Sequence, residues 1–177
     1  MSLVFPAVHD ARPEADTREP VALLASSHWH HAAAAAYEDA ELLLTSILPD
    51  ARIEHVGATA VAGALSPGGV DVCVTVPRDA FHEALGVLLE AGCVQREQDE
   101  AVERHATLAM PCAQVPVTLR LIETGSGHES LMRVRDALRA DAPLLARLDA
   151  AKAAAAPQGE RAYAAAKARF FDALSND

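Results

Sequence analysis

The sequence predicts an α+β fold, in which helices pack on a mixed β-sheet and the C-terminal segment is helical. Three short apolar runs, at residues 52–56, 70–76 and 115–123, have the length and the valine-rich composition of strands. Longer segments rich in alanine and leucine lie before and after them. The hydrophobic content is 51% but only 4% of residues are aromatic, which favours helices that pack closely through small side chains.

The remaining elements follow from periodicity and from the glycines and prolines that interrupt it. Helices are expected at residues 27–48, between Pro77 and Gly92, and at about 128–140, 143–155 and 159–174, with a short helical piece ending near Ala64. Two further strands are expected at 93–98 and 104–110. Ser26 or Ser27 is expected to cap the first helix, because a serine hydroxyl accepts a hydrogen bond from a free backbone N–H.

The length of 177 residues fits one domain, which we place at residues 21–177, after an N-terminal arm at residues 1–20. The net charge of −10 and the pI of about 5.2 argue against a broad nucleic-acid interface. We expect a cytoplasmic protein, because neither a signal peptide nor a membrane-spanning run is recognised. The three cysteines show no CxxC pair and fit a reducing compartment. Nothing in the sequence selects an oligomeric state.

The feature that most needs an explanation is Asp71, a carboxylate within the apolar run at residues 70–76. Aspartate is disfavoured in strands, and burying its charge without a partner is costly. We therefore expect either a metal ion or a cationic side chain beside it.

A second polar cluster lies in the segment His28-Trp29-His30-His31. His28 and His31 could share a helix face and bind a metal ion. Solvated histidines are the favoured interpretation, because no acidic or cysteine partner lies at ligand spacing. Trp29 is expected to anchor packing.

The chain resembles the GrpB family, bacterial proteins with a nucleotidyltransferase-like fold, in four places. Residues 53–63 read IEHVGATAVAG and residues 70–72 read VDV, against a family pattern of roughly IEHVGSTAVPG followed by IDI. Residues 123–126 and 134–139 read ETGS and VRDALR, and the C-terminal match consists of Tyr163, Lys167 and Phe170. Trp29 suits the family's N-terminal tryptophan. The resemblance extends over residues 25–172.

The resemblance implies a cleft around the glycine turn that follows the first strand. Asp71 would be the catalytic residue and the ligand of Mg²⁺ or Mn²⁺ in an active nucleotidyltransferase. The side chains and turn residues assigned to substrate binding are His55, Gly57, Ala58, Thr59, Arg120, Arg135, Arg139 and Lys167.

The chain departs from the family pattern where the chemistry would take place. Ala58 stands at the serine of the glycine turn, and Pro67 aligns with the usual lysine. Cys73 occupies the place of the second carboxylate of a nucleotidyltransferase, a residue that many GrpB members also lack. Because Mg²⁺ generally needs more than one carboxylate or substrate phosphates, Asp71 alone makes a poor metal site.

Arg120 is expected on a strand beside Asp71, and we expect the two to form an ion pair in place of a metal ion. A bidentate, hydrogen-bonded pair is a common arrangement for a desolvated acid. The alternative is that Arg120 reaches solvent from an open sheet face. We expect Cys73 to be buried and inert.

The other candidates have structural alternatives as well. Arg135 and Arg139 could form an anion clamp, or could lie on an exposed helix face paired with Asp136 or Asp141. Lys167 could be a solvated helix lysine, and His55 could face away from the cleft.

The function that we favour is the binding of a phosphorylated small molecule or nucleotide without efficient catalysis, as in a pseudoenzyme. The alternatives are an active metal-dependent nucleotidyltransferase and a non-catalytic protein-interaction module. No nucleic acid or membrane is expected as a partner.

Overall fold

The computed structural model describes residues 19–96, 104–111, 115–126 and 130–175 of the chain. The predicted arm lies outside these residues except for Glu19 and Pro20, and so does Cys112. Within them, no helix is long and apolar enough to cross a membrane.

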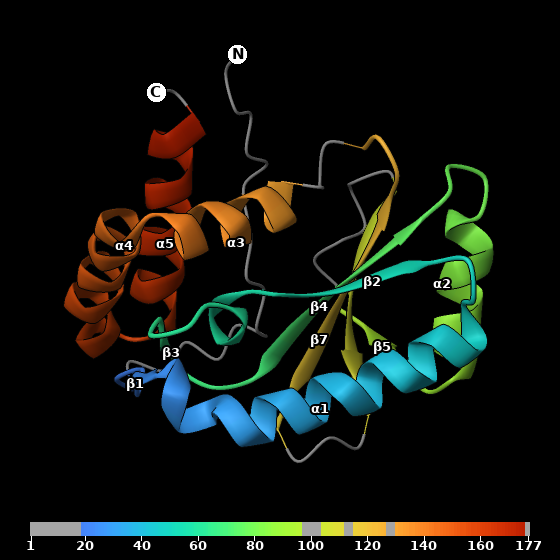
Figure 1. The fold of residues 1–177 in the computed structure, drawn as a ribbon, viewed down its shortest axis with the longest axis horizontal. Helices are drawn as coiled ribbons and strands as arrows, with labels where there is room; N and C mark the ends of the chain where they lie inside the picture. The colour runs from blue at the N-terminus through green and yellow to red at the C-terminus, as the bar shows by residue number, and fades with distance from the viewer. Residues whose placement is uncertain (1–18, 97–103, 112–114, 127–129, 176–177) are drawn as a thin grey trace.

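A mixed five-stranded sheet forms the centre of the molecule, with the strand order β2-β4-β7-β6-β5 (Figure 1). Its strands are β2 (Arg52–Val56), β4 (Val70–Val76), β5 (Val94–Gln95), β6 (His105–Met110) and β7 (Val117–Glu123). The pair β4 and β7 is parallel, and the other neighbours are antiparallel. The predicted α+β class is therefore confirmed, and β2 and β4 have the predicted bounds.

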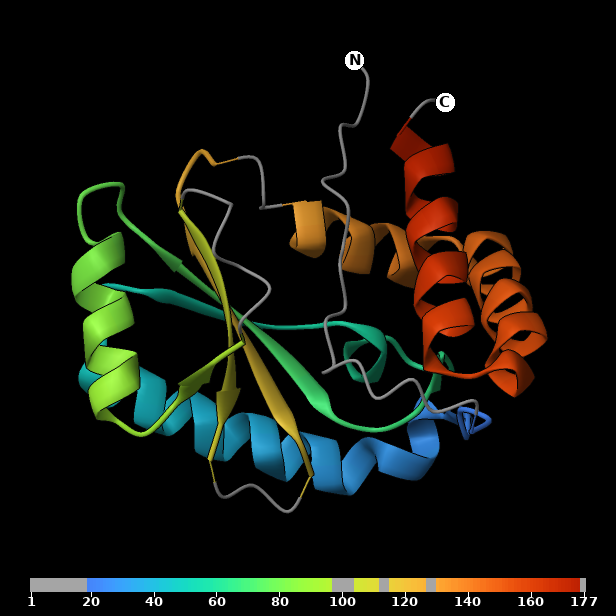
Figure 2. The same ribbon diagram turned by 180° about the vertical axis from the view of Figure 1, so that it is seen from behind.

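One face of the sheet is covered by α1 (Ser26–Ile47) and α2 (Phe81–Glu90) (Figure 2). The helix α1 buries small side chains at helical spacing, which lets it pack closely on the sheet. The main core forms between these helices and the alternate apolar residues of β4 and β7, among them Val72, Val74, Leu119 and Leu121. The intervening residues of the same strands point to the opposite face, which we call the site face.

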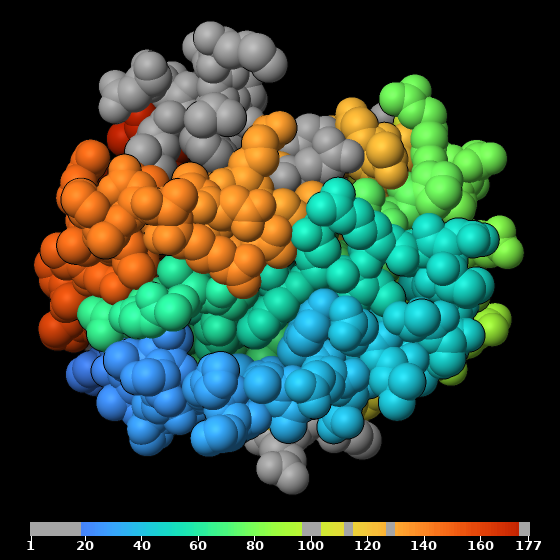
Figure 3. All heavy atoms as spheres, viewed as in Figure 1, coloured from blue at the N-terminus to red at the C-terminus, as the bar shows by residue number. Residues whose placement is uncertain are grey.

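The site face is bordered by three C-terminal helices, which are α3 (Ser130–Ala140), α4 (Ala142–Ala155) and α5 (Glu160–Ser175). The short helix η3 (Ala156–Gln158) joins α4 to α5, and the two helices lie side by side in both views (Figures 1 and 2). Asp141 caps α4, because its Oδ1 accepts a hydrogen bond from the backbone N–H of Leu144 at 2.9 Å. Figure 3 shows the surface of α3 in contact with the segment that follows β2.

Two local expectations are corrected by the structure, and one small sheet was not expected. The N-cap of α1 is Ala25, without a side-chain bond, because the Ser26 hydroxyl donates instead to the carbonyl of Val61 at 2.8 Å. Strand β5 spans only Val94–Gln95 within the described residues. An additional two-stranded sheet pairs β1 (Leu24–Ala25) with β3 (Leu65–Ser66).

Candidate functional site

A cleft lies between the site face of the sheet and helices α3, α4 and α5. It encloses about 1100 Å³, part of which is open to solvent. Its polar and charged lining side chains are Ser66, Asp71, Arg96, Thr118, Arg120, Arg135, Lys152, Tyr163 and Lys167. The cleft thus collects residues that are up to about a hundred positions apart in the chain.

Asp71 lies on the site face because β4 alternates its side chains between the two faces of the sheet. Its register partners are Val56 on β2 and Thr118 on β7. Arg120 is the register partner of Cys73, so it lies diagonally across from Asp71 on the same face. The side chain of Asp71 is 31% exposed, so its carboxylate is accessible from the cleft.

The predicted ion pair between Arg120 and Asp71 is confirmed. Arg120 Nη2 lies 3.8 Å from Asp71 Oδ1. This separation is longer than a hydrogen bond, so the expectation of a bidentate pair is wrong. The alternative in which Arg120 reaches solvent is also wrong, because only 6% of its side chain is exposed. The diagonal register explains the longer contact.

The turn after β2 places the backbone of Gly57 directly over Asp71. Gly57 has φ 74° and ψ −169°, a conformation that is essentially restricted to glycine. A Cβ added here would collide with the Asp71 carboxylate and would lie 3.0 Å from Asp71 Cβ. Gly57 and Ala58 line the cleft, as the resemblance implies.

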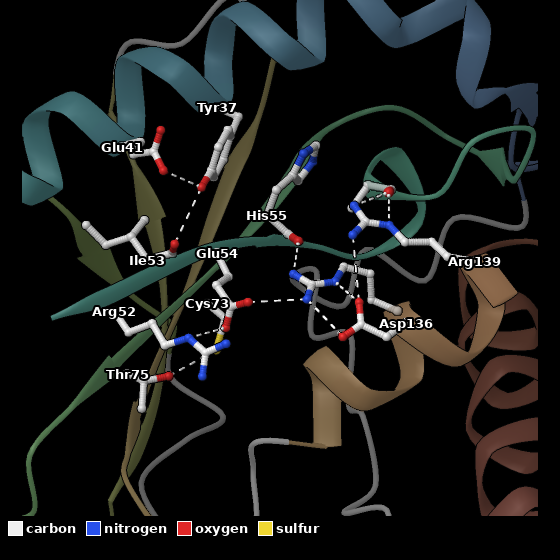
Figure 4. A network of polar contacts seen from close by, with 12 residues as sticks. Tyr37, Glu41, Arg52, Ile53, Glu54, His55, Cys73, Thr75, Asp136 and Arg139 are labelled. Atoms are coloured by element: carbon white, nitrogen blue, oxygen red, sulfur yellow. Dashed lines mark hydrogen bonds and ion pairs between the residues drawn. The ribbon is translucent and has the colours of Figure 1, made fainter.

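His55 and Thr59 do not line the cleft, which corrects their expected placement. Strand β2 directs Glu54 toward α3, so His55 points to the other face, where its ring stacks on Tyr37 with 4.9 Å between centroids (Figure 4). His55 Nε2 lies 3.0 Å from the hydroxyl of Thr59, which donates to the carbonyl of Gly69 at 3.1 Å. The threonine hydroxyl has one proton, which it donates to Gly69. His55 Nε2 must therefore carry the proton that it donates to Thr59.

The burial of His55 makes folding stability depend on pH. Burial lowers the pKa of His55 to about 4, with Arg139 and Arg135 acting in the same direction. An unfolded histidine binds a proton below about pH 6.5, whereas folded His55 does so only near pH 4. The unfolded chain therefore binds more protons in this window, and stability falls as the pH is lowered through it.

We predict that His55→Gln flattens the dependence of the free energy of unfolding on pH between pH 6.5 and 4. Urea denaturation at a series of pH values measures this slope. His82→Gln, at an exposed position in α2, is the matched control and should keep the original slope. An unchanged slope in His55→Gln would contradict the prediction.

Arg135 and Arg139 hold α3 against the turn after β2. Arg135 Nη1 donates to the carbonyl of His55 at 3.0 Å, and its Nη2 donates to Glu54 Oε1 at 3.2 Å. Arg139 donates twice to the carbonyl of Ala60, at 3.0 and 2.7 Å. These contacts engage both guanidinium groups, so they do not form an open anion clamp.

The alternative pairing of these arginines with Asp136 is present. Arg135 Nε donates to Asp136 Oδ1 at 2.8 Å, and Arg139 Nη1 lies 3.7 Å from the same oxygen. The hydrogen bond to Asp136 raises the pKa of Arg135. Arg135 lines the cleft and is 11% exposed, whereas Arg139 is 48% exposed and is not among the lining residues.

Two lysines extend the cationic lining onto α4 and α5. Lys167, which the resemblance indicated, has its Nζ 5.3 Å from the centre of the Tyr163 ring. Lys152, to which the sequence does not point, is 2% exposed, and its Nζ donates at 2.6 Å to the carbonyl of Leu65 and lies 2.6 Å from Asp149. Burial lowers the pKa of Lys152, and the hydrogen bond to Asp149 opposes this shift. In the sequence, only the spacing indicates that Lys152 could be buried, because Leu145, Leu148 and Lys152 share one helix face.

The loop between β3 and β4 borders the cleft and is supported by Trp29 of α1. The indole Nε1 donates to the carbonyl of Ser66 at 3.3 Å. Gly68 has φ +95°, and a Cβ there would lie 3.1 Å from the indole ring. The expectation that Trp29 anchors packing is confirmed, since it packs against the main core.

The cleft is cationic although the protein is acidic. Among the described residues, five Lys and Arg side chains line it (Arg96, Arg120, Arg135, Lys152 and Lys167), with Asp71 as the one lining carboxylate. Two of these cations are also paired with carboxylates outside the lining, Arg135 with Glu54 and Lys152 with Asp149. The whole chain carries a formal charge of −10. Charges of one sign that line a concave surface focus the local potential and attract ligands of opposite charge.

The described residues of the cleft do not fit a two-metal site. Cys73, at the place of a second carboxylate, is buried, and burial raises the pKa of its thiol to about 11. Within the described part of the chain no three His, Cys, Asp or Glu side chains are grouped as metal ligands require, and this includes the histidines at the start of α1. Asp71 alone, paired with Arg120, offers too few oxygen ligands for Mg²⁺.

The chain is similar in sequence and in fold to known proteins. A UPF0157 protein of Vibrio cholerae is 26% identical over 136 residues, which cover 77% of this chain and 72% of that protein. The crystal structure of GrpB from Enterococcus faecalis superposes with a TM-score of 0.65 and 19% identity, over 88% of this chain and 98% of that chain.

A more distant likeness is to Cid1 poly(U) polymerase, solved with MgGTP bound. The TM-score is 0.50 and the identity 16%, over 71% of this chain but only 42% of that chain, so the likeness concerns the fold. The family model described as GrpB protein matches residues 23–177. The described fold and the match over nearly the whole chain show that this protein belongs to the GrpB family.

Proposed function

We propose that the cleft binds a phosphorylated small molecule or nucleotide without efficient catalysis. The observation that carries this proposal is the cationic lining of the described part of the cleft, where Arg96, Arg120 and Lys167 line it with Asp71 in a protein of net charge −10. Arg135 and Lys152 also line it, but each is paired with a carboxylate outside the lining. Phosphate groups are recognised by arginine and lysine through charge-assisted hydrogen bonds, which are about twice as strong as neutral ones. The binding of MgGTP by Cid1, which has a similar fold, supports a phosphate-bearing ligand.

Weak or absent catalysis is inferred from what surrounds Asp71. Transfer of a phosphoryl or nucleotidyl group depends on metal ions and cations that neutralise the developing charge. Arg120 lies in ion-pair contact with the carboxylate, and Cys73 takes the place of a second acid. Ala58 provides no hydroxyl at the glycine turn. The site is therefore suited to holding an anion.

An active metal-dependent nucleotidyltransferase is the second candidate. It is favoured by one observation, the position of the partly exposed Asp71 within the cleft beneath the turn at Gly57. The two candidates differ in what Asp71 does when a ligand is present: it repels an anion in a metal-free site, but it is required in a metal-dependent one.

Titration calorimetry with pyrophosphate, ATP, CTP and GTP, each with and without Mg²⁺ or Mn²⁺, tests the proposal. We expect binding without metal. Arg120→Gln should weaken it by about tenfold to a hundredfold, since hydrogen bonds to charged groups contribute about 1.5–3 kcal/mol. Arg133→Gln, at an exposed position on α3 outside the cleft lining, is the matched control and should not change the affinity. Melting temperatures establish that both variants are folded.

Asp71→Asn separates the two candidates. Metal-free binding should be unchanged or tighter in this variant, because a negative charge has been removed from an anion site. Metal-dependent binding that Asp71→Asn abolishes would favour the active enzyme. The absence of binding to all of these anions would overturn the proposed function.

A further inference from the structure

Besides its cations, the cleft has an aliphatic wall. Helix α3 contributes Leu131, Val134 and Leu138, and α4 contributes Leu145 and Leu148, in each case at the three- or four-residue spacing of one helix face. Leu131, Val134 and Leu145 are only half-buried, so part of their surface is open to a ligand. An apolar ligand group that contacts this surface would bind more tightly, because apolar area is removed from water.

The polar and apolar residues follow an order along α4 and α5. These helices are neighbours joined by η3, so residues equally far from η3 lie at the same level. Lys152 and Tyr163 are one turn from the connection, and Leu148 and Lys167 follow on the next turn. Leu145 lies farther out, beyond the lysines. A ligand whose phosphate lies near Lys167, the half-buried lysine of the two, would place its remaining atoms against the aliphatic wall.

The described lining has few groups that could recognise a nucleobase. It contains no Asn or Gln side chain, the types that pair with base edges. Its two aromatic rings, Tyr163 and Phe171, are only 2% and 6% exposed, so neither offers a face for stacking. The Lys167 ammonium lies 5.3 Å from the centre of the Tyr163 ring. Base stacking is a main source of affinity for nucleotides in other proteins.

We propose that the ligand of this cleft is a phosphate monoester with a short aliphatic body, and that it is preferred over a nucleotide. This inference rests on the proposed function, since it assumes that the cations bind the phosphate. It adds the chemical class of the part of the ligand other than the phosphate, because the aliphatic wall favours an apolar group there.

Calorimetry with methyl, butyl and hexyl phosphate, compared with ribose 5-phosphate and AMP, tests the proposal. Each methylene that contacts the wall should tighten binding by up to about fourfold, which corresponds to about 0.8 kcal/mol. We expect hexyl phosphate to bind at least about tenfold more tightly than methyl phosphate or AMP. Hexanol, which lacks the phosphate, should bind far more weakly than hexyl phosphate.

A matched pair of variants locates the effect. Leu145→Asn should weaken hexyl phosphate binding about tenfold and should change methyl phosphate binding less than about twofold. Leu144→Asn lies at the next residue, which is equally half-buried but does not line the cleft, and should leave both affinities unchanged. Melting temperatures are compared first, and Val134→Asn replaces Leu145→Asn if the latter is unfolded.

The outcomes distinguish this inference from the proposed function. Binding that does not strengthen with chain length, or that is as tight for AMP as for hexyl phosphate, would overturn the inference and leave phosphate binding intact. Failure of every phosphate ester to bind would overturn the proposed function and the inference together. Hexanol binding as tightly as hexyl phosphate would also contradict both, because the cations would then contribute nothing.

Discussion

Replacing Gly57 with alanine is expected to destabilise the fold by about 3 kcal/mol. The backbone conformation at φ 74° and ψ −169° alone costs a non-glycine residue about 1–3 kcal/mol. The new Cβ would also collide with the Asp71 carboxylate, which the strand holds in place below the turn. Urea denaturation would measure the loss, and ligand affinity should fall as well because this turn lines the cleft.

Gly63→Ala is the control for this prediction. Gly63 has φ +81°, but no atom lies within 4 Å of an added Cβ, so this variant experiences the backbone strain without the collision. A larger loss in Gly57→Ala than in Gly63→Ala indicates a cost beyond that of the positive φ that both glycines share. Adding Asp71→Ala to Gly57→Ala should recover part of the stability. No recovery of stability in the double variant would show that the turn does not press on Asp71.

The second large effect is expected for Arg135→Met. The guanidinium of Arg135 is 11% exposed and connects α3 to β2 through Glu54 and the carbonyl of His55. Its removal leaves the largely buried Glu54 with Arg52, 3.0 Å away, as an ionic partner, and leaves the carbonyl of His55 with fewer partners. The expected cost is about 2 kcal/mol, within the range for buried polar groups that lose a hydrogen bond. Because α3 forms one wall of the cleft, the cleft should also lose affinity for its ligand. Chemical denaturation and calorimetry measure the two effects.

Arg139→Met, one helical turn later, is the matched control for Arg135→Met. Arg139 also binds a backbone carbonyl, that of Ala60, but its side chain is 48% exposed. Water can replace its contacts, so the expected loss is about 1 kcal/mol or less. If both variants lost the same stability, the burial of Arg135 would not explain its contribution to the free energy of unfolding.

The sequence predicted the regular elements well where an apolar run was bounded by glycine or proline. Strand β4 is such a run, and its bounds agree with the structure. The pair formed by β1 and β3 was not predictable in this way, because a strand of two residues shows no periodicity. The hydroxyl of Ser26 satisfies the carbonyl of Val61, which is distant in sequence, so a local capping rule gave the wrong partner.

For the cleft, the family pattern located the turn at Gly57 and the Asp71–Arg120 pair, but not the direction of every side chain. Strand β2 is at least partly buried on both faces, so its composition does not reveal which face borders the cleft, and His55 was assigned to the wrong one. The spacing of Lys152 from Leu145 and Leu148 was too weak a signal to predict its burial, because a lysine in the last turn of a helix usually interacts with the helix dipole in solvent. Only the tertiary contact with Leu65 shows that it is buried.

The contact between Trp29 and the loop after β3 has a practical consequence. Trp29 is the only tryptophan of the chain, and its indole lies against Gly68 and donates to Ser66, two residues of the cleft lining. Indole fluorescence responds to the polarity and rigidity of its surroundings. The protein therefore carries an intrinsic optical reporter of this loop, and ligand titrations can be followed by emission without a label.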